Sequence, residues 1–222
     1  VLSVLTGRGD LAPALARCAE LRRAEASLSS LALDESAVAD ISKLCDAAAH
    51  ARSLGHVAQM PWLLFWGPRG IGKREVAARI AASAGRQLLI FDPNRVEQGT
   101  LDDLLRRAER EALLRGAVLY IGPLRADLLA DNARELMKRI VDYPSLVILG
   151  VESMAPPRFK VEHSLQEIEL SLPSEPTRRK LWEVALPAAR RGPDLDLDSL
   201  ARAFHLTPGE IQETGREAVE LA

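Results

Sequence analysis

The chain has 222 residues, enough for one large domain or for a medium-sized domain with a small satellite. Its 47% hydrophobic and 27% charged residues are typical of globular proteins and exclude disordered and collagen-like classes. Its 29 basic and 31 acidic side chains give a net charge of −2, which does not favour non-specific binding to nucleic acid or to anionic lipid. No apolar stretch approaches the ~20 residues of a membrane-spanning helix. We therefore expect a cytoplasmic protein with neither nucleic acid nor membrane as a partner.

The first part of the chain is predicted to be helical. An Ala-rich, Leu-containing pattern indicates a helix over about 10–26, followed by a linker of small residues at 27–30. Asp34 is the expected N-cap of a second helix that reaches about residue 53. Because the chain opens at Val1 in what reads as the middle of an element, residues 1–33 are expected to be a helix and linker from a longer chain.

From Pro61 onward, short apolar runs alternate with amphipathic helices, as in a parallel sheet that is buried on both faces. The expected strands are 62–66, 87–91, 117–121, 145–150 and 165–170, and the expected helices between them are 73–84, 101–115 and 128–142. After Pro173 the strand-like runs cease, and three helical segments follow at 175–190, 197–203 and 208–221, the last with Thr207 as its cap. We expect an α/β base over 34–172 and a small all-helical part over 173–222.

The most informative segment, WGPRGIGKR at 66–74, follows one expected strand and opens a helix. Its glycines and lysine fit the spacing G-x-x-x-x-G-K, in which backbone N–H groups wrap a phosphate and the lysine reaches the outer phosphates. The positive N-terminal end of the helix would lie beneath those phosphates. The sequence therefore predicts a phosphate-binding loop. Its expected binding residues are Gly67, Pro68, Arg69, Gly70, Ile71, Gly72, Lys73 and Arg74.

Several segments resemble the AAA+ ATPase family. LLFWGPRGIGKREVAARIAASAGRQLLIFD is similar to the opening of an AAA+ module, and LDESAVADISKLCDAAAHARSLG is similar to the helix that precedes the P-loop in a bacterial AAA group. LSLPSEPTRRKLW and LARAFHLTPGEIQETGREA resemble the passage into the helical lid. The resemblance covers about residues 31–222 and implies a P-loop NTPase fold, a five-stranded parallel sheet followed by a small helical lid. It also implies partners: other AAA+ modules or subunits of a ring, and a protein substrate or adaptor.

The sequence departs from that family at the residues that support catalysis. An active P-loop ends in Ser or Thr, whose hydroxyl binds Mg²⁺, and here this position is Arg74. The two acidic residues that end the third strand in active members are replaced by Gly122 and Pro123, which can neither bind metal nor accept a proton. Asp127 and Asp131 lie too far along the chain to substitute for them. In that group some proteins carry two tandem modules, the first degenerate, and this sequence resembles the degenerate one; Mg²⁺ is not expected.

Two further family landmarks are altered. After the fourth strand, a polar residue should orient the attacking water, and Glu152 and Ser153 stand nearby, although an acidic side chain facing the γ-phosphate is unfavourable. In the lid, the segment that usually supplies an Arg to the nucleotide has Gln212 and Glu213 in its place, with Arg216 one turn later.

Other candidates are weighed against ordinary structural roles. Arg158 could be an intersubunit Arg or a surface residue, and Arg178 and Arg179 could face a partner module, although a surface position is favoured. Trp62 and Trp66 could stack a base, but aromatic residues on a buried strand are more often core. The two cysteines and four histidines show no metal-ligand or catalytic spacing, so no zinc site is expected and no residue is assigned a catalytic role.

Three functions remain open. The first is a degenerate AAA+ module that binds ATP or ADP weakly or not at all, does not hydrolyse it, and has a structural or regulatory role in a ring. The second is an active ATPase with an atypical site, and the third is a nucleotide-free adaptor. For Arg74, a role as a tethered cation beside the phosphates and a position in solvent are both expected possibilities.

Overall fold

The structure is a computed structural model that describes residues 11–22, 33–97, 99–125, 143–157, 164–187 and 195–221. In this part of the chain, six strands form one sheet in the order β1-β3-β4-β5-β2-β6. Every neighbouring pair is parallel except β1 with β3, which is antiparallel. The strands are β1 (Ala19–Arg22), β2 (Trp62–Gly67), β3 (Leu88–Phe91), β4 (Val118–Arg125), β5 (Val147–Glu152) and β6 (Leu165–Glu169).

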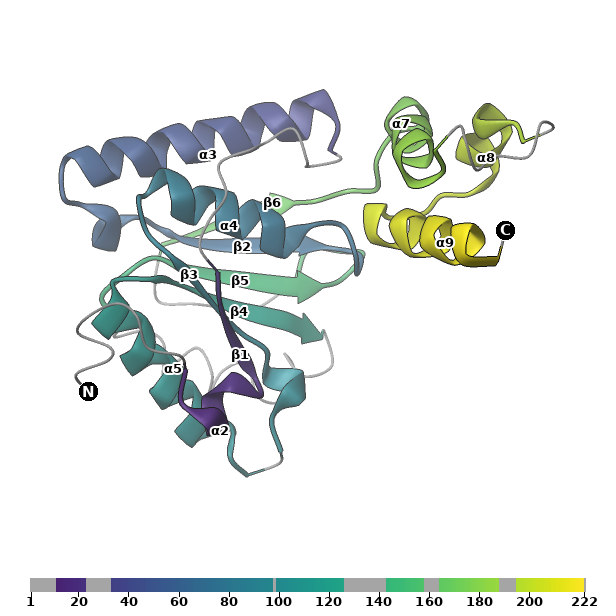
Figure 1. Cartoon of the computed structure of the whole chain (residues 1–222). Helices are drawn as coiled ribbons and strands as arrows, with labels where there is room; N and C mark the ends of the chain where they lie inside the picture. Colours follow the sequence, from purple (N-terminus) through teal and green to yellow (C-terminus); the bar gives the residue numbers. More distant parts are fainter. Residues whose placement is uncertain are drawn as a thin grey trace.

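Helices cover both faces of this sheet (Figure 1). On one face, α3 (Glu35–Ser53) and α4 (Lys73–Ser83) pack on alternate strand residues such as Leu63 and Phe65. On the other face, α5 (Leu101–Arg115) and the four-residue α2 (Pro13–Ala16) pack on the intervening residues. Because successive strand side chains point to opposite faces, one run of apolar residues supplies both cores.

The α/β class and the positions of the five parallel strands are confirmed. The helix expected over 10–26 is wrong, because within the described residues 11–22 only Pro13–Ala16 is helical and Ala19–Arg22 forms the sixth strand. The β1 backbone pairs with β3, from Ala19 opposite Phe91 to Arg22 opposite Leu88. These long-range hydrogen bonds override the helical propensity of the Ala- and Leu-rich sequence. The linker at 27–30 and the helix at 128–142 lie outside the described residues.

Three helices follow the sheet: α7 (Glu175–Ala185), α8 (Leu197–Ala203) and α9 (Pro208–Leu221). They share a small core of their own, formed by Trp182, Leu186, Leu197, Ala201 and Ile211. We call them the C-terminal helical group, and Figure 1 shows this group beyond the ends of β4 and β5. The first helix ends at Ala185, earlier than the expected residue 190, and 188–194 lie outside the described residues.

Asp34 joins the start of α3 to the start of α7. It occupies the N-cap position of α3, as expected, but its carboxylate makes no capping hydrogen bond to that helix. The carboxylate instead accepts hydrogen bonds from the hydroxyl groups of Ser174 (2.7 Å) and Thr177 (2.6 Å). Burial raises the pKa of Asp34, but these hydrogen bonds outweigh burial, and the net effect is a lowered pKa. In the described residues, no helix is both long and apolar enough to cross a membrane.

Candidate functional site

The P-loop connects β2 to α4. Strand β2 ends at Gly67 and α4 begins at Lys73, so the loop lies at the carboxyl end of a buried strand. A Cβ atom on Gly67 would lie 2.1 Å from the backbone oxygen of Leu170, and one on Gly70, where φ is +78°, would lie 2.7 Å from Thr207 Oγ1. Only glycine fits these two positions, because the backbone must approach its neighbours closely. The expected strand, glycine loop and helix are therefore present.

Lys73 lies within the loop and is 6% exposed. Its Nζ atom donates hydrogen bonds to the backbone oxygens of Gly67 (2.8 Å) and Pro68 (2.7 Å). Burial lowers the pKa of Lys73 to about 8, and the negative charge of Glu152 partly opposes this shift. The lysine therefore places a positive charge against the inner surface of the loop.

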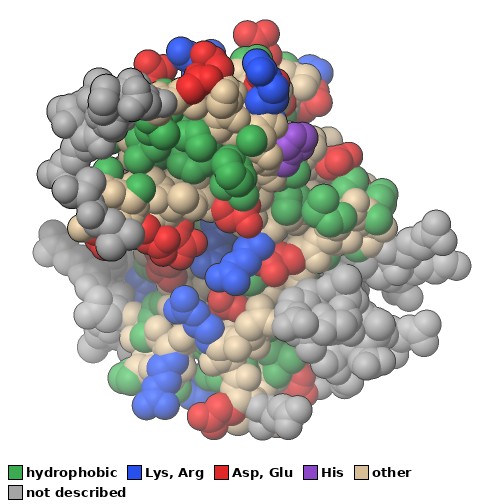
Figure 2. All heavy atoms as spheres, turned by 90° about the vertical axis from the view of Figure 1, so that its right-hand side faces the viewer, with side chains coloured by type: hydrophobic (Ala, Val, Ile, Leu, Met, Phe, Trp, Pro, Cys, Tyr) green, Lys and Arg blue, Asp and Glu red, His purple; other side chains and the backbone are tan. Residues whose placement is uncertain are grey.

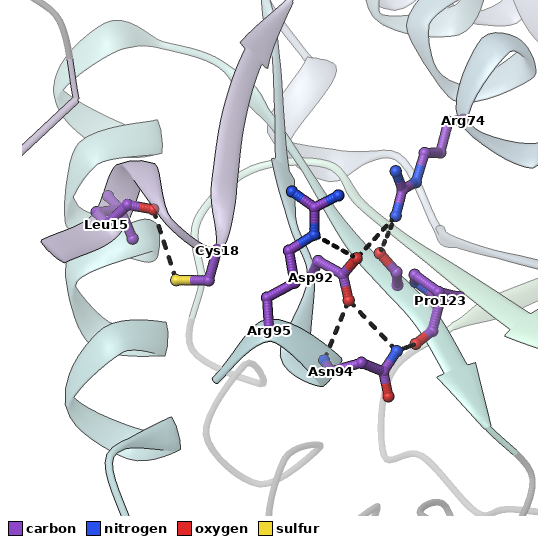
Figure 3. A network of polar contacts seen from close by, with 8 residues as sticks. Leu15, Cys18, Arg74, Asp92, Asn94, Arg95 and Pro123 are labelled. Carbon is purple, nitrogen blue, oxygen red and sulfur yellow. Dashed lines mark hydrogen bonds and ion pairs between the residues drawn. The ribbon is translucent and has the colours of Figure 1, made fainter. Parts of the chain in front are cut away.

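Arg74 points toward the carboxyl ends of β3 and β4. Its Nη2 atom donates to Asp92 Oδ2 at 3.0 Å and lies 3.4 Å from the backbone oxygen of Gly122 (Figure 3). The Arg74 side chain is 31% exposed, so the expectation of a side chain free in solvent is wrong. Arg74 lines the site, as the tethered-cation interpretation requires, but its guanidinium is paired with a carboxylate of the protein.

Asp92 is the centre of a polar network between the ends of β3 and β4. It accepts hydrogen bonds from Asn94 N (3.1 Å) and Asn94 Nδ2 (3.3 Å), and its Oδ2 atom lies 3.6 Å from Arg95 Nε. Asn94 Nδ2 also donates to the backbone oxygen of Pro123 at 2.7 Å (Figure 3). The network fixes Asp92 and surrounds its carboxylate with two arginines.

Gly122 and Pro123 lie within β4, which continues to Arg125 and is longer than the expected strand. The pairing of β4 with β5 shifts register between Ile121 and Leu124. A Cβ atom on Gly122 would lie 2.6 Å from the backbone oxygen of Gly150, so this position has no room for a carboxylate side chain. Asp127 and Asp131 lie outside the described residues.

Glu152 ends β5 directly beside the P-loop. In the parallel ladder it pairs with Gly67, and the next residue, Ser153, donates its backbone N–H to the Gly67 oxygen at 3.3 Å. The hydroxyl of Ser153 donates to the backbone oxygen of Ala155 at 2.6 Å. The sequence offered Glu152 and Ser153 as polar candidates after the fourth expected strand, which is β5. Of these two residues, Glu152 lines the site.

The C-terminal helical group closes another side of the site. The N–H of Gly209, in the first turn of α9, donates to the backbone oxygen of Gly70 at 3.0 Å. Thr207 and Glu210 exchange hydrogen bonds as a capping box, which confirms Thr207 as the cap of α9. Gln212 faces the cavity. Glu213 and Arg216 are exposed and do not line it.

Together these elements enclose a cavity of about 760 Å³, within the usual range for ligand sites. Figure 2 faces this end of the molecule and shows Lys and Arg side chains in a hollow flanked by Asp and Glu. Of the expected binding residues, Arg69 to Arg74 line the cavity, whereas Gly67 and Pro68 contribute oxygens to Lys73. The other lining residues are Glu75, Asp92, Asn94, Arg95, Tyr120, Pro123, Glu152, Pro208, Gly209 and Gln212.

Sequence reasoning missed Asp92, Asn94, Arg95 and Tyr120. Asp92 and the two residues after Pro93 follow β3, and Tyr120 lies on β4. The available signal was their place at the carboxyl ends of two expected strands, because the carboxyl ends of parallel strands meet at one edge of a sheet.

The remaining candidates have other roles. Trp62 and Trp66 are buried in the sheet core, as favoured. The surface position favoured for Arg178 is wrong, because its guanidinium is buried and donates to the backbone oxygens of Ala201 and Pro173. Arg179 is at the surface and pairs with Asp198. Arg158 and His163 lie outside the described residues.

No family model and no curated protein matches the chain. Among solved structures, one that concerns the structural basis for katanin self-assembly matches with a TM-score of 0.71 and 15% sequence identity. The match covers 94% of this chain and 76% of that chain. At this identity the likeness shows the fold, which is that of an AAA+ P-loop NTPase with one additional antiparallel strand, β1.

Proposed function

We propose that this chain is a degenerate AAA+ module that holds ATP or ADP without hydrolysing it and has a structural or regulatory role in a ring assembly. One observation carries the proposal: the phosphate loop and Lys73 are in place, whereas Gly122 and Pro123 stand where active members have acids. The same cavity can therefore bind phosphate without the groups that activate water.

Phosphate binding is supported by the geometry of the loop. Its backbone and the N-terminal end of α4 favour an anion, and Lys73 supplies a buried cation. The hydrogen bonds from Lys73 Nζ to the Gly67 and Pro68 oxygens can be exchanged for stronger, charge-assisted bonds to phosphate oxygens.

The described residues do not fit a magnesium site of the P-loop type. Arg74 replaces the hydroxyl ligand, and its positive charge would repel the metal. The carboxylate of Asp92 is bound to Arg74 at 3.0 Å. Neither Gly122 nor Pro123 has a carboxylate that could act as a general base. Strand β4 therefore supplies no group at these positions to activate water for phosphoryl transfer.

We extend the proposal to the organisation of the chain. Residues 34–172 would be the nucleotide-binding base, 173–222 the lid and 1–33 a preceding segment. Support for the division comes from the separate core of the C-terminal helical group. The partners would be other AAA+ modules or subunits of a ring, together with a protein substrate or adaptor. The structural relative described for katanin self-assembly supports a fold that is compatible with such assembly.

The proposal is tested by measuring binding and turnover on the same protein. ADP is titrated by calorimetry with EDTA and again with Mg²⁺, and phosphate release is measured with ATP, using Lys73→Ala as the control. We expect ADP binding that is lost in Lys73→Ala and that rises less than about tenfold with Mg²⁺. Phosphate release should equal that of the control.

Each alternative has its own result. Phosphate release above the Lys73→Ala control would identify an active ATPase with an atypical site. A chain that binds neither ADP nor ATP would be a nucleotide-free adaptor.

A further inference from the structure

We propose that Glu152 makes this site selective for nucleoside diphosphates, so that the module distinguishes ADP from ATP by the charge of the third phosphate. The inference rests on the proposed function and adds a specificity-determining residue to it. Strand pairing puts this residue beside the P-loop, because Glu152 pairs with Gly67 in the β2–β5 ladder.

Glu152 lines the cavity together with the lysine that would reach the outer phosphate. In P-loop proteins the lysine reaches the β- and γ-phosphates. Glu152 and Lys73 line the same cavity and interact electrostatically. The end of β5 is held against the loop by the hydrogen bond from Ser153 N to the Gly67 oxygen. The backbone of Glu152 is therefore held beside the loop, and its carboxylate would face the phosphate that the lysine reaches last.

The other cationic side chains of the cavity are either paired or exposed. Arg69 lines the cavity from the loop, but it is exposed, so solvent screens its charge. Arg74 is paired with Asp92 at 3.0 Å, and Arg95 lies 3.6 Å from the same carboxylate. On α9, Gln212 lines the cavity with a neutral amide. The inner phosphates would meet the loop backbone and the start of α4, whereas the third phosphate would compete with Glu152 for the buried charge of Lys73.

A screening metal would change this balance, and the site lacks the hydroxyl ligand for one at Arg74. Adding the third phosphate brings about one more negative charge next to Glu152 in a partly desolvated cavity. Like charges this close repel strongly where the effective dielectric constant is far below that of water. ADP therefore gains the attractive contacts of the site without this repulsion.

The sequence offers a closely matched control. Glu169 ends β6 on the opposite side of β2 and pairs with Trp66, one residue before Gly67. It lines a different groove, between α3 and β6. Glu152→Gln and Glu169→Gln therefore remove the same charge from the two strands that flank β2, at positions one residue apart along β2, but only the first removes it from the nucleotide cavity.

The test is a calorimetric titration of the whole chain with ADP and with ATP in EDTA. We expect the original protein to bind ADP about tenfold more tightly than ATP. In Glu152→Gln the ratio should fall toward one, mainly because ATP binds more tightly, and in Glu169→Gln it should stay unchanged. Glu152→Ala provides a second variant, and circular dichroism checks that each variant is folded.

Equal affinity for ADP and ATP in the original protein would overturn the inference while leaving the proposed function in place. An equal change of the ratio in Glu152→Gln and Glu169→Gln would overturn it too, because overall charge rather than position would then decide. If neither nucleotide binds, the proposed function itself fails, and the inference fails with it.

Discussion

Lys73 and Arg74 are adjacent in sequence, yet their positive charges have different surroundings. Lys73 is buried against backbone oxygens of the loop and interacts electrostatically with Glu152. Arg74 is bound to the Asp92 carboxylate. Of these two residues, Lys73 has the charge that is available to a phosphate, whereas Arg74 mainly joins the ends of β3 and β4.

The pKa of Lys73 predicts how nucleotide binding depends on pH. Because burial lowers it to about 8, the lysine loses its proton above that pH, and a phosphate favours the protonated form. ADP affinity should fall about tenfold between pH 7 and pH 9. Calorimetric titrations at a series of pH values measure this decrease.

Lys73→Arg is the control for this pH dependence, since the guanidinium keeps its charge over the whole range. Its ADP affinity, whatever its absolute value, should not fall between pH 7 and pH 9. An equal decrease in both proteins would show that another group titrates.

Gly122 makes restoration of catalysis by substitution difficult. On the sequence alone, the minimum repair is Arg74→Thr with Gly122→Asp and Pro123→Glu. In the structure, any Cβ at Gly122 meets the Gly150 oxygen at 2.6 Å. We expect Gly122→Ala to lower the free energy of unfolding by about 1–3 kcal/mol, measured by urea denaturation, and the triple variant to remain inactive.

Gly55→Ala is the matched control for this measurement. Gly55 has a φ of +73° and no atom within 4 Å of an added Cβ, so it measures the cost of an alanine without a close contact. That cost should be about 1 kcal/mol. A Gly122→Ala variant as stable as the original protein would contradict the proposed close approach.

At the scale of elements, β1 and α2 attach the N-terminal segment to the sheet. β1 covers the edge of β3, and the backbone oxygen of Cys18 accepts a hydrogen bond from the backbone N–H of Asp92 at 2.8 Å. Leu15 of α2 is 2% exposed in the core beneath the sheet. Since Asp92 also holds Arg74, the segment supports one wall of the P-loop cavity.

Leu15→Ala should therefore lower the stability of the folded protein, as substitutions in a hydrophobic core do. We expect the free energy of unfolding to fall by about 2–4 kcal/mol in urea denaturation, because a buried side chain is removed and a cavity remains. Leu114→Ala, at a position that is 50% exposed on α5, should change it by less than about 0.5 kcal/mol. Equal effects would mean that α2 does not contribute to the folded core.

At the scale of the whole molecule, the cavity depends on two separately packed parts. The sheet contributes the P-loop and the ends of β3, β4 and β5, and the C-terminal helical group contributes Gln212 and the first turn of α9. These parts meet where Gly209 donates to the Gly70 oxygen. The position of the helical group is therefore coupled directly to the phosphate loop.

The proposed place in a ring leads to a prediction about assembly. The AAA+ resemblance implies that nucleotide lies between subunits, and a module with a weak site gains little subunit affinity from it. We expect this chain to be largely monomeric at low concentration and to join a ring when full-length partners are added. Analytical ultracentrifugation measures this, and a stable hexamer of the chain by itself would show that subunit packing alone is sufficient.

The sequence by itself determined the parts that depend on local patterns. Glycine spacing identified the P-loop, and apolar runs identified the parallel strands, because each signal is carried by a few consecutive residues. The caps and periodicity of α8 and α9 likewise gave their bounds, 197–203 and 208–221.

Only the tertiary structure decided the features that join distant parts of the chain. The strand β1 exists because it pairs with β3, about 70 residues later, which no local propensity encodes. The surroundings of Arg74 depend on Asp92 and on Gly122, which are 18 and 48 residues away. Glu152 acquired its place beside Lys73 because β5 lies next to β2 in the sheet, and strand order is set by packing rather than by position along the chain.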